Sequence, residues 1–440
     1  MSFQEENDKL VSHFLEKTFF KAWRSRNGAL ANWRRVELFL NTRCNQACVY
    51  CYLNRYGSKL YPEQLQDDRA VLSNLRMFLD WLTSKSYKPD FEIFSGEPLV
   101  QEIGYRALEM ILRSYLRHKL LPVQVVVPSN YTFILNNHLT SRVIGLLRTY
   151  HDCDSKLILS TSIDGKYCES NRPLKSLGAD PRDDKFYDRV FSFNRRFGFG
   201  FHPMVYSRNI ECWIDNFVWF QDMFRKHRIP YYNLYLLEVR NKEWSPASIR
   251  GFGEFVSFII KWTWKHKCGE NRAKFLDFLF RFRGYNMLQS PFSTIGRGIG
   301  CSIQGTFTLR VGDLCLVPCH RTAYRQFELA RFKTSNGRIS GLEAINPELM
   351  ITIYTLHSNN FPYCESCPIK NLCSKGCLGS QFEATGDLFT PIPTVCQLEH
   401  WKLYNIIKTF KEIGVLPIIK ERTTPDKRFE IEFIEREIRR

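Results

Sequence analysis

The chain has 440 residues, of which 44% are hydrophobic and 15% aromatic, so it carries enough apolar surface for a folded protein of two or three domains. Its longest apolar runs, such as residues 255–260, meet charged residues well before the roughly 20 residues that a membrane helix needs. Glu5, Glu6 and Asp8 stand where a secretory signal needs an apolar stretch. These features exclude a spanning segment and favour a cytoplasmic protein with no membrane partner.

The net charge and the cysteine count bear on the partners and the metal content of the protein. A net charge of +17 suits a nucleic-acid partner, an acidic peptide or simply a soluble surface, and does not choose among them. In a reducing compartment 15 cysteines are not expected to form a disulfide framework. We therefore expect metal ligands or core residues.

Strand-like and helix-like segments alternate over the first 240 residues. Six runs rich in apolar, β-branched and aromatic residues predict buried strands: 36–41, 91–95, 123–128, 157–163, 200–206 and 232–238. Between them, apolar residues recur at helical spacing in three sets: Leu72, Leu75, Leu79 and Leu82; Leu108, Ile111, Leu112 and Tyr115; and Phe217, Phe220 and Phe224. This alternation implies parallel pairing with right-handed crossovers.

We therefore expect an α/β fold whose core is a partial, open (β/α)6 TIM-like barrel, because six units fall short of the eight of a closed barrel. The expected domains are an N-terminal extension (1–35), the barrel (36–240), a helical bridge (241–300), a cysteine-rich domain (301–400) and a C-terminal helical tail (401–440). Mixed charge over residues 429–440 predicts a solvated helix or tail.

Three cysteines follow the first predicted strand, in Cys44-Asn45-Gln46-Ala47-Cys48-Val49-Tyr50-Cys51. Three thiolates at this spacing can hold three irons of a [4Fe-4S] cluster and leave the fourth iron open. The pattern CxxxCxxC, with an aromatic residue before the last cysteine, resembles that of the radical S-adenosylmethionine (SAM) enzymes. The resemblance covers the predicted barrel.

Later strand ends extend the resemblance. Ser95-Gly96-Glu97-Pro98 resembles the turn whose carboxylate holds the SAM ammonium, with Ser for the first Gly, and Ser129-Asn130 resembles the polar turn after strand three. Ser162 and Asp164 are similar to the residues that reach the ribose and methionyl groups, and Arg172 to the arginine that meets the carboxylate. The resemblance implies these SAM contacts: Tyr50 (through its backbone), Ser95, Gly96, Glu97, Asn130, Ser162, Asp164 and Arg172.

A second cysteine field reads Cys364-x2-Cys367-x5-Cys373-x3-Cys377 and is followed by Cys396. Zinc bound by four thiolates is one interpretation of such spacing. Placed after a radical SAM barrel, the pattern resembles the SPASM extension, which binds two auxiliary [4Fe-4S] clusters. The resemblance implies Cys364, Cys367, Cys373 and Cys396 for the distal cluster, and Cys301, Cys315, Cys319 and Cys377 for the nearer one. With Cys44, Cys48 and Cys51 this makes three clusters, and leaves Cys153, Cys168, Cys212 and Cys268 as structural residues.

The family resemblance implies an oxidoreductase that generates a 5′-deoxyadenosyl radical from SAM and abstracts hydrogen from a substrate carbon. We expect a peptide maturase that forms an oxidative intramolecular cross-link, carbon–carbon or thioether, in a ribosomally made precursor peptide. Epimerisation or another protein modification, such as sulfatase maturation, is the first alternative. Sulfatase maturation is disfavoured because His320 stands where that group has an Asp base; His320 is then either a base or a surface residue.

The expected partners are the precursor peptide and a one-electron reductant. Leader recognition falls to the barrel surface or to a separate leader-binding protein, since only 43 residues precede Cys44. RNA modification is the second alternative, but the basic residues are spread along the chain and nucleic acid is not the expected partner. Glu238 and Arg240, at the end of the sixth predicted strand, form either a structural ion pair or a substrate contact.

Overall fold

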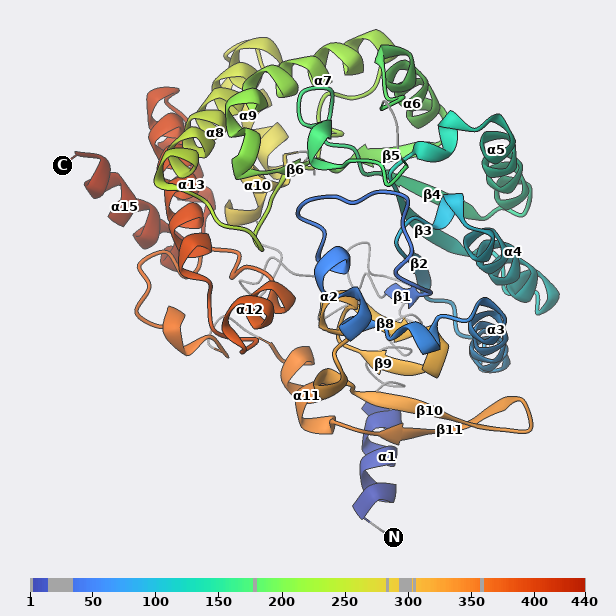
Figure 1. The fold of residues 1–440 in the computed structure, drawn as a ribbon. Helices are drawn as coiled ribbons and strands as arrows, with labels where there is room; N and C mark the ends of the chain where they lie inside the picture. Colours follow the sequence, from blue (N-terminus) through green and yellow to red (C-terminus); the bar gives the residue numbers. More distant parts are fainter. Residues whose placement is uncertain are drawn as a thin grey trace. The chain divides into compact units, whose positions relative to one another are not determined.

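The computed structural model describes residues 3–14, 35–176, 180–281, 285–292, 303, 306–356 and 360–439 (Figure 1). The chain forms two compact units. Unit 1 comprises residues 1–162, 173–199 and 302–355, and unit 2 comprises residues 163–172, 200–301 and 356–440. In the described residues no helix is both long and apolar enough to cross a membrane.

A parallel sheet forms the centre of unit 1. Its first four strands are β1 (Arg35–Phe39), β2 (Asp90–Phe94), β3 (Gln124–Ser129) and β4 (Lys156–Thr161), each paired in parallel with the next. β1 is buried after its first residue, and in β2 and β3 every second residue is fully buried. The four strands therefore end at the same edge of the sheet, where the loops that follow them meet.

Helices connect these strands and cover the sheet (Figure 1). They are α2 (Tyr52–Leu60), α3 (Asp68–Ser84), α4 (Glu102–Arg117), α5 (Asn137–Asp152) and α6 (Asp184–Phe197). The predicted apolar faces are the buried ones: Leu75, Leu79 and Leu82 of α3, and Leu108, Ile111, Leu112 and Tyr115 of α4. Leu72 lies at the margin of its face and is only half-buried.

Four more strands extend the sheet beyond β1. β8 (Thr306–Arg310) pairs in parallel with β1, and β9 (Cys315–Val317), β10 (Ala330–Ser335) and β11 (Arg338–Ala344) follow as antiparallel neighbours. The sheet order is β11-β10-β9-β8-β1-β2-β3-β4-β5, and β5 (Gly198–Phe201) begins in unit 1. α1 (Phe3–Phe14) lies against β11, where the Asp8 carboxylate accepts a hydrogen bond from the Ala344 amide at 2.7 Å. α11 (Pro347–Tyr354) follows β11.

Unit 2 is mainly helical. Its small parallel sheet consists of β6 (Met204–Val205) and β7 (Leu237–Glu238), with a single bridge between Phe201 and Leu234. The helices are α7 (Trp213–His227), α8 (Pro246–His266), α9 (Arg272–Arg281), α10 (Asn286–Gln289), α12 (Leu378–Thr385), α13 (Pro393–Glu412), α14 (Leu416–Arg422) and α15 (Pro425–Arg439). α8 packs along α13, where the Thr409 hydroxyl donates to Ser257 at 3.0 Å.

The expected α/β class and its large parallel sheet are confirmed, but the strands are distributed differently from a simple six-strand barrel. The predicted strand 200–206 is divided between β5 and β6, because Pro203 has no amide hydrogen to continue the ladder. The predicted strand 232–238 is reduced to the Leu234 bridge and β7. β8 to β11, which were not predicted as part of this sheet, come from the segment expected to be a separate cysteine-rich domain.

The C-terminal segment was predicted to be solvated, and this is wrong for one of its faces. α15 is a helix, but Ile431 and Ile434 are fully buried and the Glu430 carboxylate accepts hydrogen bonds from the amides of Asn371 and Leu372. Its apolar residues lie three positions apart and so share one helical face. The domain boundaries given above remain predictions.

The buried face of α3 provides a test of the core of unit 1. Leu75→Ala removes a side chain with 0% exposure and should cost about 2–5 kcal/mol of stability through lost burial and a cavity. Leu116→Ala, on a side chain that is 51% exposed, should cost less than about 0.5 kcal/mol. Urea unfolding followed by circular dichroism measures both, and equal losses would contradict the assigned face.

Candidate functional site

The three-cysteine loop lies between β1 and α2 at the carboxyl end of the parallel strands. Cys44, Cys48 and Cys51 are all half-buried and none of them forms a disulfide bond, and Cys51 is the N-cap residue of α2. The Gln46 amide lies 3.4 Å from the Cys44 sulfur, and the Cys51 amide donates to the Cys48 carbonyl at 3.0 Å. Three cysteine thiols on one short loop fit the donor set of an open [4Fe-4S] cluster.

The loop segment 173–175, which follows β4 in the chain, helps to hold the cysteine loop in place. The Ala47 amide donates to the Pro173 carbonyl at 2.8 Å, and the Lys175 amide donates to the Asn45 carbonyl at 2.9 Å. Both bonds lie within unit 1 and join segments more than 120 positions apart in the sequence. The loop is therefore fixed by tertiary contacts as well as by its own turn.

The turn after β2 packs directly against the loop. The Glu97 amide donates to the Arg43 carbonyl at 2.9 Å. A Cβ atom on Gly96 would lie only 1.9 Å from that same carbonyl oxygen, so any larger residue would displace the backbone next to Cys44. The close approach of the two backbones thus explains why a glycine stands at position 96. The preceding turn residue, Ser95, donates its hydroxyl hydrogen to the Asn41 side chain at 2.7 Å.

The Glu97 carboxylate is 2% exposed and connects the turn after β2 to the end of β3. It accepts hydrogen bonds from the Leu99 amide at 3.2 Å, the Ser129 hydroxyl at 2.9 Å and the Asn130 amide at 2.6 Å. The Asn130 side chain in turn donates to the Asn45 side chain of the cysteine loop at 2.9 Å. The bonds therefore hold this carboxylate at the junction of the β2 and β3 turns, next to the cysteine loop.

Two further predicted SAM contacts also lie in unit 1. Tyr50 is buried within the cysteine loop, and the Ser162 amide donates to the Ser129 carbonyl at 2.8 Å, just after β4. The structure thus brings the cysteine loop together with Ser95, Gly96, Glu97 and Asn130, and it joins Ser162 to the neighbouring strand end.

Asp164 and Arg172 belong to unit 2 and form a buried cluster with Glu169. Asp164 has 0% exposure; its carboxylate accepts a hydrogen bond from the Met204 amide at 3.0 Å and lies 3.6 Å from the Arg172 guanidinium. Glu169, which the sequence analysis missed, accepts hydrogen bonds from the amides of Asp164 and Gly165 at 2.8 and 3.1 Å. The sequence does contain a sign of this role: Glu169 is an acidic residue only five positions after Asp164, so its side chain can reach the backbone amides of the turn.

Four cysteines of the second field line one small cavity in unit 2: Cys364, Cys373, Cys377 and Cys396. Burial of its sulfur and the proximity of the Cys364 and Cys367 thiols raise the pKa of Cys396 to about 11, so Cys367 lies close to the same group. Burial and the Glu399 carboxylate raise the pKa of Cys373 to about 12. These clustered thiols suit a metal or an iron–sulfur cluster, which would deprotonate them on binding. Cys377, expected at the nearer cluster, lines the same cavity as three of the residues expected at the distal one.

A buried ionic network forms one wall of this cavity. Arg240 donates to Glu399 at 2.8 Å and to the hydroxyl of Ser374, the residue after Cys373, at 2.9 Å, and it also pairs with Glu238. Lys402 pairs with Glu399 at 2.8 Å. Although burial alone would raise it, the charges of Arg240 and Lys402 hold the pKa of Glu238 well below its usual range. Of the two interpretations for Glu238 and Arg240, the structure shows the ion pair.

The cysteines expected at the nearer cluster are divided between the two units. Cys301 lies outside the described residues, and Cys377 belongs to unit 2, whereas Cys315 and Cys319 belong to unit 1. Cys315 is fully buried in β9, and its sulfur lies with carboxylate oxygens of Asp313 and Glu328, all within 4.8 Å of one another. Arg310 bonds to both carboxylates. The Cys319 sulfur contacts the Thr322 hydroxyl at 3.3 Å.

His320 is half-buried and held in place by side chains of unit 1. Its Nδ1 lies 2.9 Å from the Glu37 carboxylate, and its ring stacks on Phe94 with 3.7 Å between ring centroids. Burial alone would raise the pKa of Glu37, but the charge and hydrogen bonds of His320 bring it below its usual value. His320 is therefore a fixed partner of Glu37 rather than a solvated surface residue.

The four cysteines left over divide into two pairs. Cys168 and Cys268 are buried, as expected for structural residues. Cys153 and Cys212 are only half-buried. None of the four is a predicted ligand.

Comparisons with known proteins show which solved structures this fold resembles. No protein-family model matches the chain, and no curated protein matches it. Among solved structures, native anSMEcpe with bound AdoMet and Cp18Cys peptide matches with a TM-score of 0.57 and 15% identity, over 88% of this chain and 99% of that one. Two structures of SuiB from Streptococcus suis, one bound to S-adenosylmethionine, match with TM-scores of 0.43 and 0.44 and identities of 10% and 12%. Each covers 88% of this chain and 80% of the SuiB chain.

The match to anSMEcpe, a radical SAM maturase with a SPASM domain, extends over nearly the whole of both chains. The chain therefore has the mixed α/β fold of these enzymes, with a large parallel sheet, and the resemblance inferred from its motifs is confirmed at the level of the fold.

Proposed function

We propose that this protein is a cytoplasmic radical SAM enzyme that forms an oxidative intramolecular cross-link in a ribosomally made precursor peptide. One observation carries the proposal: a loop with three cysteines after β1 packs, through Arg43 and Asn45, against the Glu97 and Asn130 turns in a fold similar to that of anSMEcpe. The solved anSMEcpe structure contains a bound peptide, which supports a peptide substrate for this chain.

The cofactors follow from the arrangement of the donors. With SAM bound at a [4Fe-4S] cluster on Cys44, Cys48 and Cys51, the pair supplies a 5′-deoxyadenosyl radical that takes hydrogen from a substrate carbon. The buried Glu97 carboxylate suits the SAM ammonium, since the two charges form a charge-assisted hydrogen bond. The further SAM contacts that we propose are Tyr50, Ser95, Gly96, Asn130 and Ser162, together with Asp164 and Arg172 for the ribose and the carboxylate.

The second cysteine field supports the oxidative part of the proposal. Cys364, Cys367, Cys373 and Cys396 would hold one auxiliary [4Fe-4S] cluster, and Cys301, Cys315, Cys319 and Cys377 another. A clustered set of thiols beside the Lys375 side chain provides a favourable site for an anionic iron–sulfur group. Such a site can accept the electron that remains after a cross-link forms. A one-electron reductant and, for leader recognition, a separate binding protein are the further partners we propose.

The iron content tests the cofactor set. After anaerobic reconstitution we expect three [4Fe-4S] clusters, hence about twelve irons per chain. Replacing Cys44, Cys48 and Cys51 by Ala should remove about four of these irons and all SAM cleavage, while the iron at the other cysteines remains. Metal analysis and 5′-deoxyadenosine assays measure the two quantities. Zinc at the second cysteine field in protein purified without oxygen would contradict the auxiliary clusters.

Glu97 offers a test of SAM binding. Glu97→Gln should weaken SAM binding by about 1.5–3 kcal/mol, because the bond to the ammonium loses its negative charge. Ser129→Ala is the matched control: it removes one hydrogen bond to Glu97 and keeps the carboxylate, so SAM affinity should fall much less. Asp164→Ala should weaken SAM binding through the ribose. Calorimetric titration with SAM measures all three, and unchanged affinity in both carboxylate variants would mean that the assigned contacts are wrong.

The mass of the product tests the reaction. A substrate carbon radical that couples to a second side chain must lose one more electron and a proton, so each cross-link removes two hydrogens. With its precursor peptide, SAM and a reductant, the enzyme should yield a peptide lighter by about 2 Da per turnover, together with 5′-deoxyadenosine. An unchanged peptide mass would indicate epimerisation, and modified RNA with untouched peptide would exclude a peptide substrate.

A further inference from the structure

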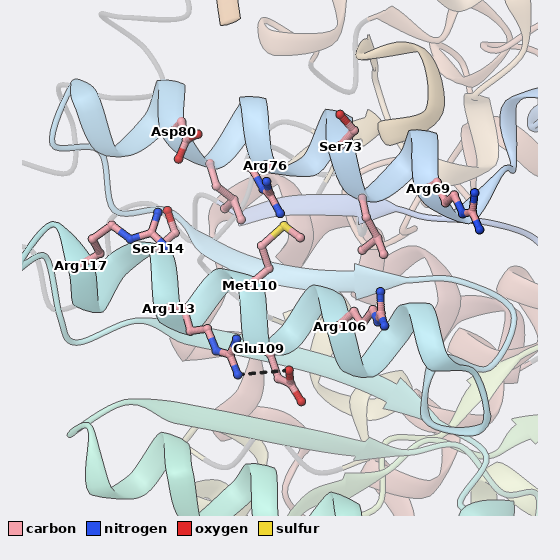
Figure 2. A pocket seen from close by; sticks show the side chains of 12 residues that line it. Arg69, Ser73, Arg76, Asp80, Arg106, Glu109, Met110, Arg113, Ser114 and Arg117 are labelled. Atoms are coloured by element: carbon pink, nitrogen blue, oxygen red, sulfur yellow. Dashed lines mark ion pairs between the residues drawn. The ribbon is translucent and has the colours of Figure 1, made fainter. Parts of the chain in front are cut away.

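A groove of about 710 Å³ runs between α3 and α4 on unit 1, and arginines dominate its lining (Figure 2). We call it the arginine groove and define it by Arg69 and Arg76 of α3 and Arg106, Arg113 and Arg117 of α4. All five arginines are exposed. The function proposed above assigns no role to this surface.

The two helices present matching rows of side chains to the groove. On α3, Arg69, Ser73, Arg76 and Asp80 lie at positions i, i+4, i+7 and i+11, and on α4 Arg106, Met110, Arg113 and Arg117 have the same spacing. This spacing places each set on one helical face, and eleven residues span roughly 16 Å. Figure 2 shows the two rows running side by side, with Arg69 and Arg106 toward one end and Asp80 and Arg117 toward the other.

The groove carries a net positive charge. Five arginines face two carboxylates, Asp80 and Glu109, so the balance is +3. Arg113 lies 3.6 Å from Glu109, and Arg106 lies 3.3 Å from Glu102. Arg69, Arg76 and Arg117 form no ion pair with any residue that the structure describes. Exposed guanidinium groups without a carboxylate partner favour an anionic ligand, above all one that offers carboxylates.

One residue of the cysteine loop holds the beginnings of both groove helices. Arg43 directly precedes Cys44, and its guanidinium pairs with Asp68, the first residue of α3. Its carbonyl accepts a hydrogen bond at 2.6 Å from the side chain of Gln101, the N-cap residue of α4. The Arg69 and Arg106 end of the groove is therefore the end joined to the three-cysteine loop.

We propose that the arginine groove is the docking surface for a small acidic electron-carrier protein that reduces the iron–sulfur centre at Cys44, Cys48 and Cys51. This inference rests on the proposed function, which requires one external electron for each SAM cleaved. In the step, the carrier loses one electron and the iron–sulfur centre gains it, and no atom is transferred. Acidic groups on the carrier meet the unpaired arginines, and Asp80 and Glu109 accept basic groups at its margin.

The lining of the groove favours this partner over the other anionic macromolecules. Among the residues that the structure describes, no aromatic side chain lines the groove, so this lining offers no stacking surface of the kind that binds single-stranded RNA. A peptide substrate must reach the carboxyl ends of the strands, where the chemistry of such a fold takes place. An electron carrier, in contrast, only has to approach the cysteine loop from outside the sheet.

The test compares two triple variants of the full-length, reconstituted protein. The groove variant carries Arg69→Gln, Arg76→Gln and Arg117→Gln. The control variant carries Arg148→Gln, Lys185→Gln and Arg195→Gln, which removes the same three charges from exposed positions on α5 and α6. Reduced flavodoxin, an acidic one-electron flavoprotein, serves as the carrier, and loss of iron–sulfur absorbance gives the rate of reduction. Calorimetry with oxidised flavodoxin gives the affinity.

The groove variant should be reduced by flavodoxin at least about tenfold more slowly than the parent protein at low salt, because steered association depends on the local charge. Its affinity for oxidised flavodoxin should fall in parallel, and its rate should depend less on ionic strength. The control variant should stay within about twofold of the parent. Equal rates for the two variants would overturn the docking surface.

Dithionite separates this inference from the proposed function. As a small reductant it needs no docking surface, so parent, groove variant and control should reduce and cleave SAM equally with it. If dithionite-treated parent protein cleaves no SAM, the proposed function fails, whatever the groove does. If the groove variant is instead reduced normally by flavodoxin but has a raised KM for the precursor peptide under dithionite, the groove binds peptide and the electron-carrier proposal is overturned.

Discussion

The arrangement of the candidate site depends on a single buried carboxylate. Glu97 follows β2, and its side chain accepts hydrogen bonds from the Ser129 hydroxyl and the Asn130 amide at the end of β3. Its backbone amide donates to the Arg43 carbonyl beside the cysteine loop after β1. A buried carboxylate is costly unless it is hydrogen-bonded, so these bonds fix three neighbouring strand ends relative to one another. The cysteine loop thus has a rigid base before any cofactor binds.

Much of this arrangement could be predicted from local sequence. The apolar faces of α3 and α4 follow from a repeat that needs only a few neighbouring residues, and the turn chemistry of Gly96 needs only its immediate surroundings. Motifs at successive strand ends also share an edge of the sheet by necessity, because parallel strands place their carboxyl ends together. The grouping of Glu97 and Asn130 near Cys44 is a consequence of that rule.

Long-range pairing could not be predicted in the same way. β8 pairs with β1 across some 270 positions, and nothing in the sequence of Thr306–Arg310 specifies that partner. The same holds for His320, whose contact with Glu37 joins residues 283 positions apart. Pro203 shows the opposite case: it is a local signal against a continuous strand, although it stands within an apolar run that favours one.

Arginine side chains have two different roles in this molecule, structural pairing and an available surface charge, and these roles differ in how far the side chain is exposed to water. In unit 2, the half-buried Arg240 lies among Glu238, Glu399 and Ser374, so its charge is already matched and its hydrogen bond holds the Ser374 side chain next to Cys373. A buried guanidinium left unpaired would cost several kcal/mol, roughly 3–5 by comparison with other broken buried pairs. On α3, Arg69 and Arg76 pay no such penalty, because water solvates them. Their charge remains available to a partner, and since α3 is tied to Arg43, any partner held there is also held near the cysteine loop.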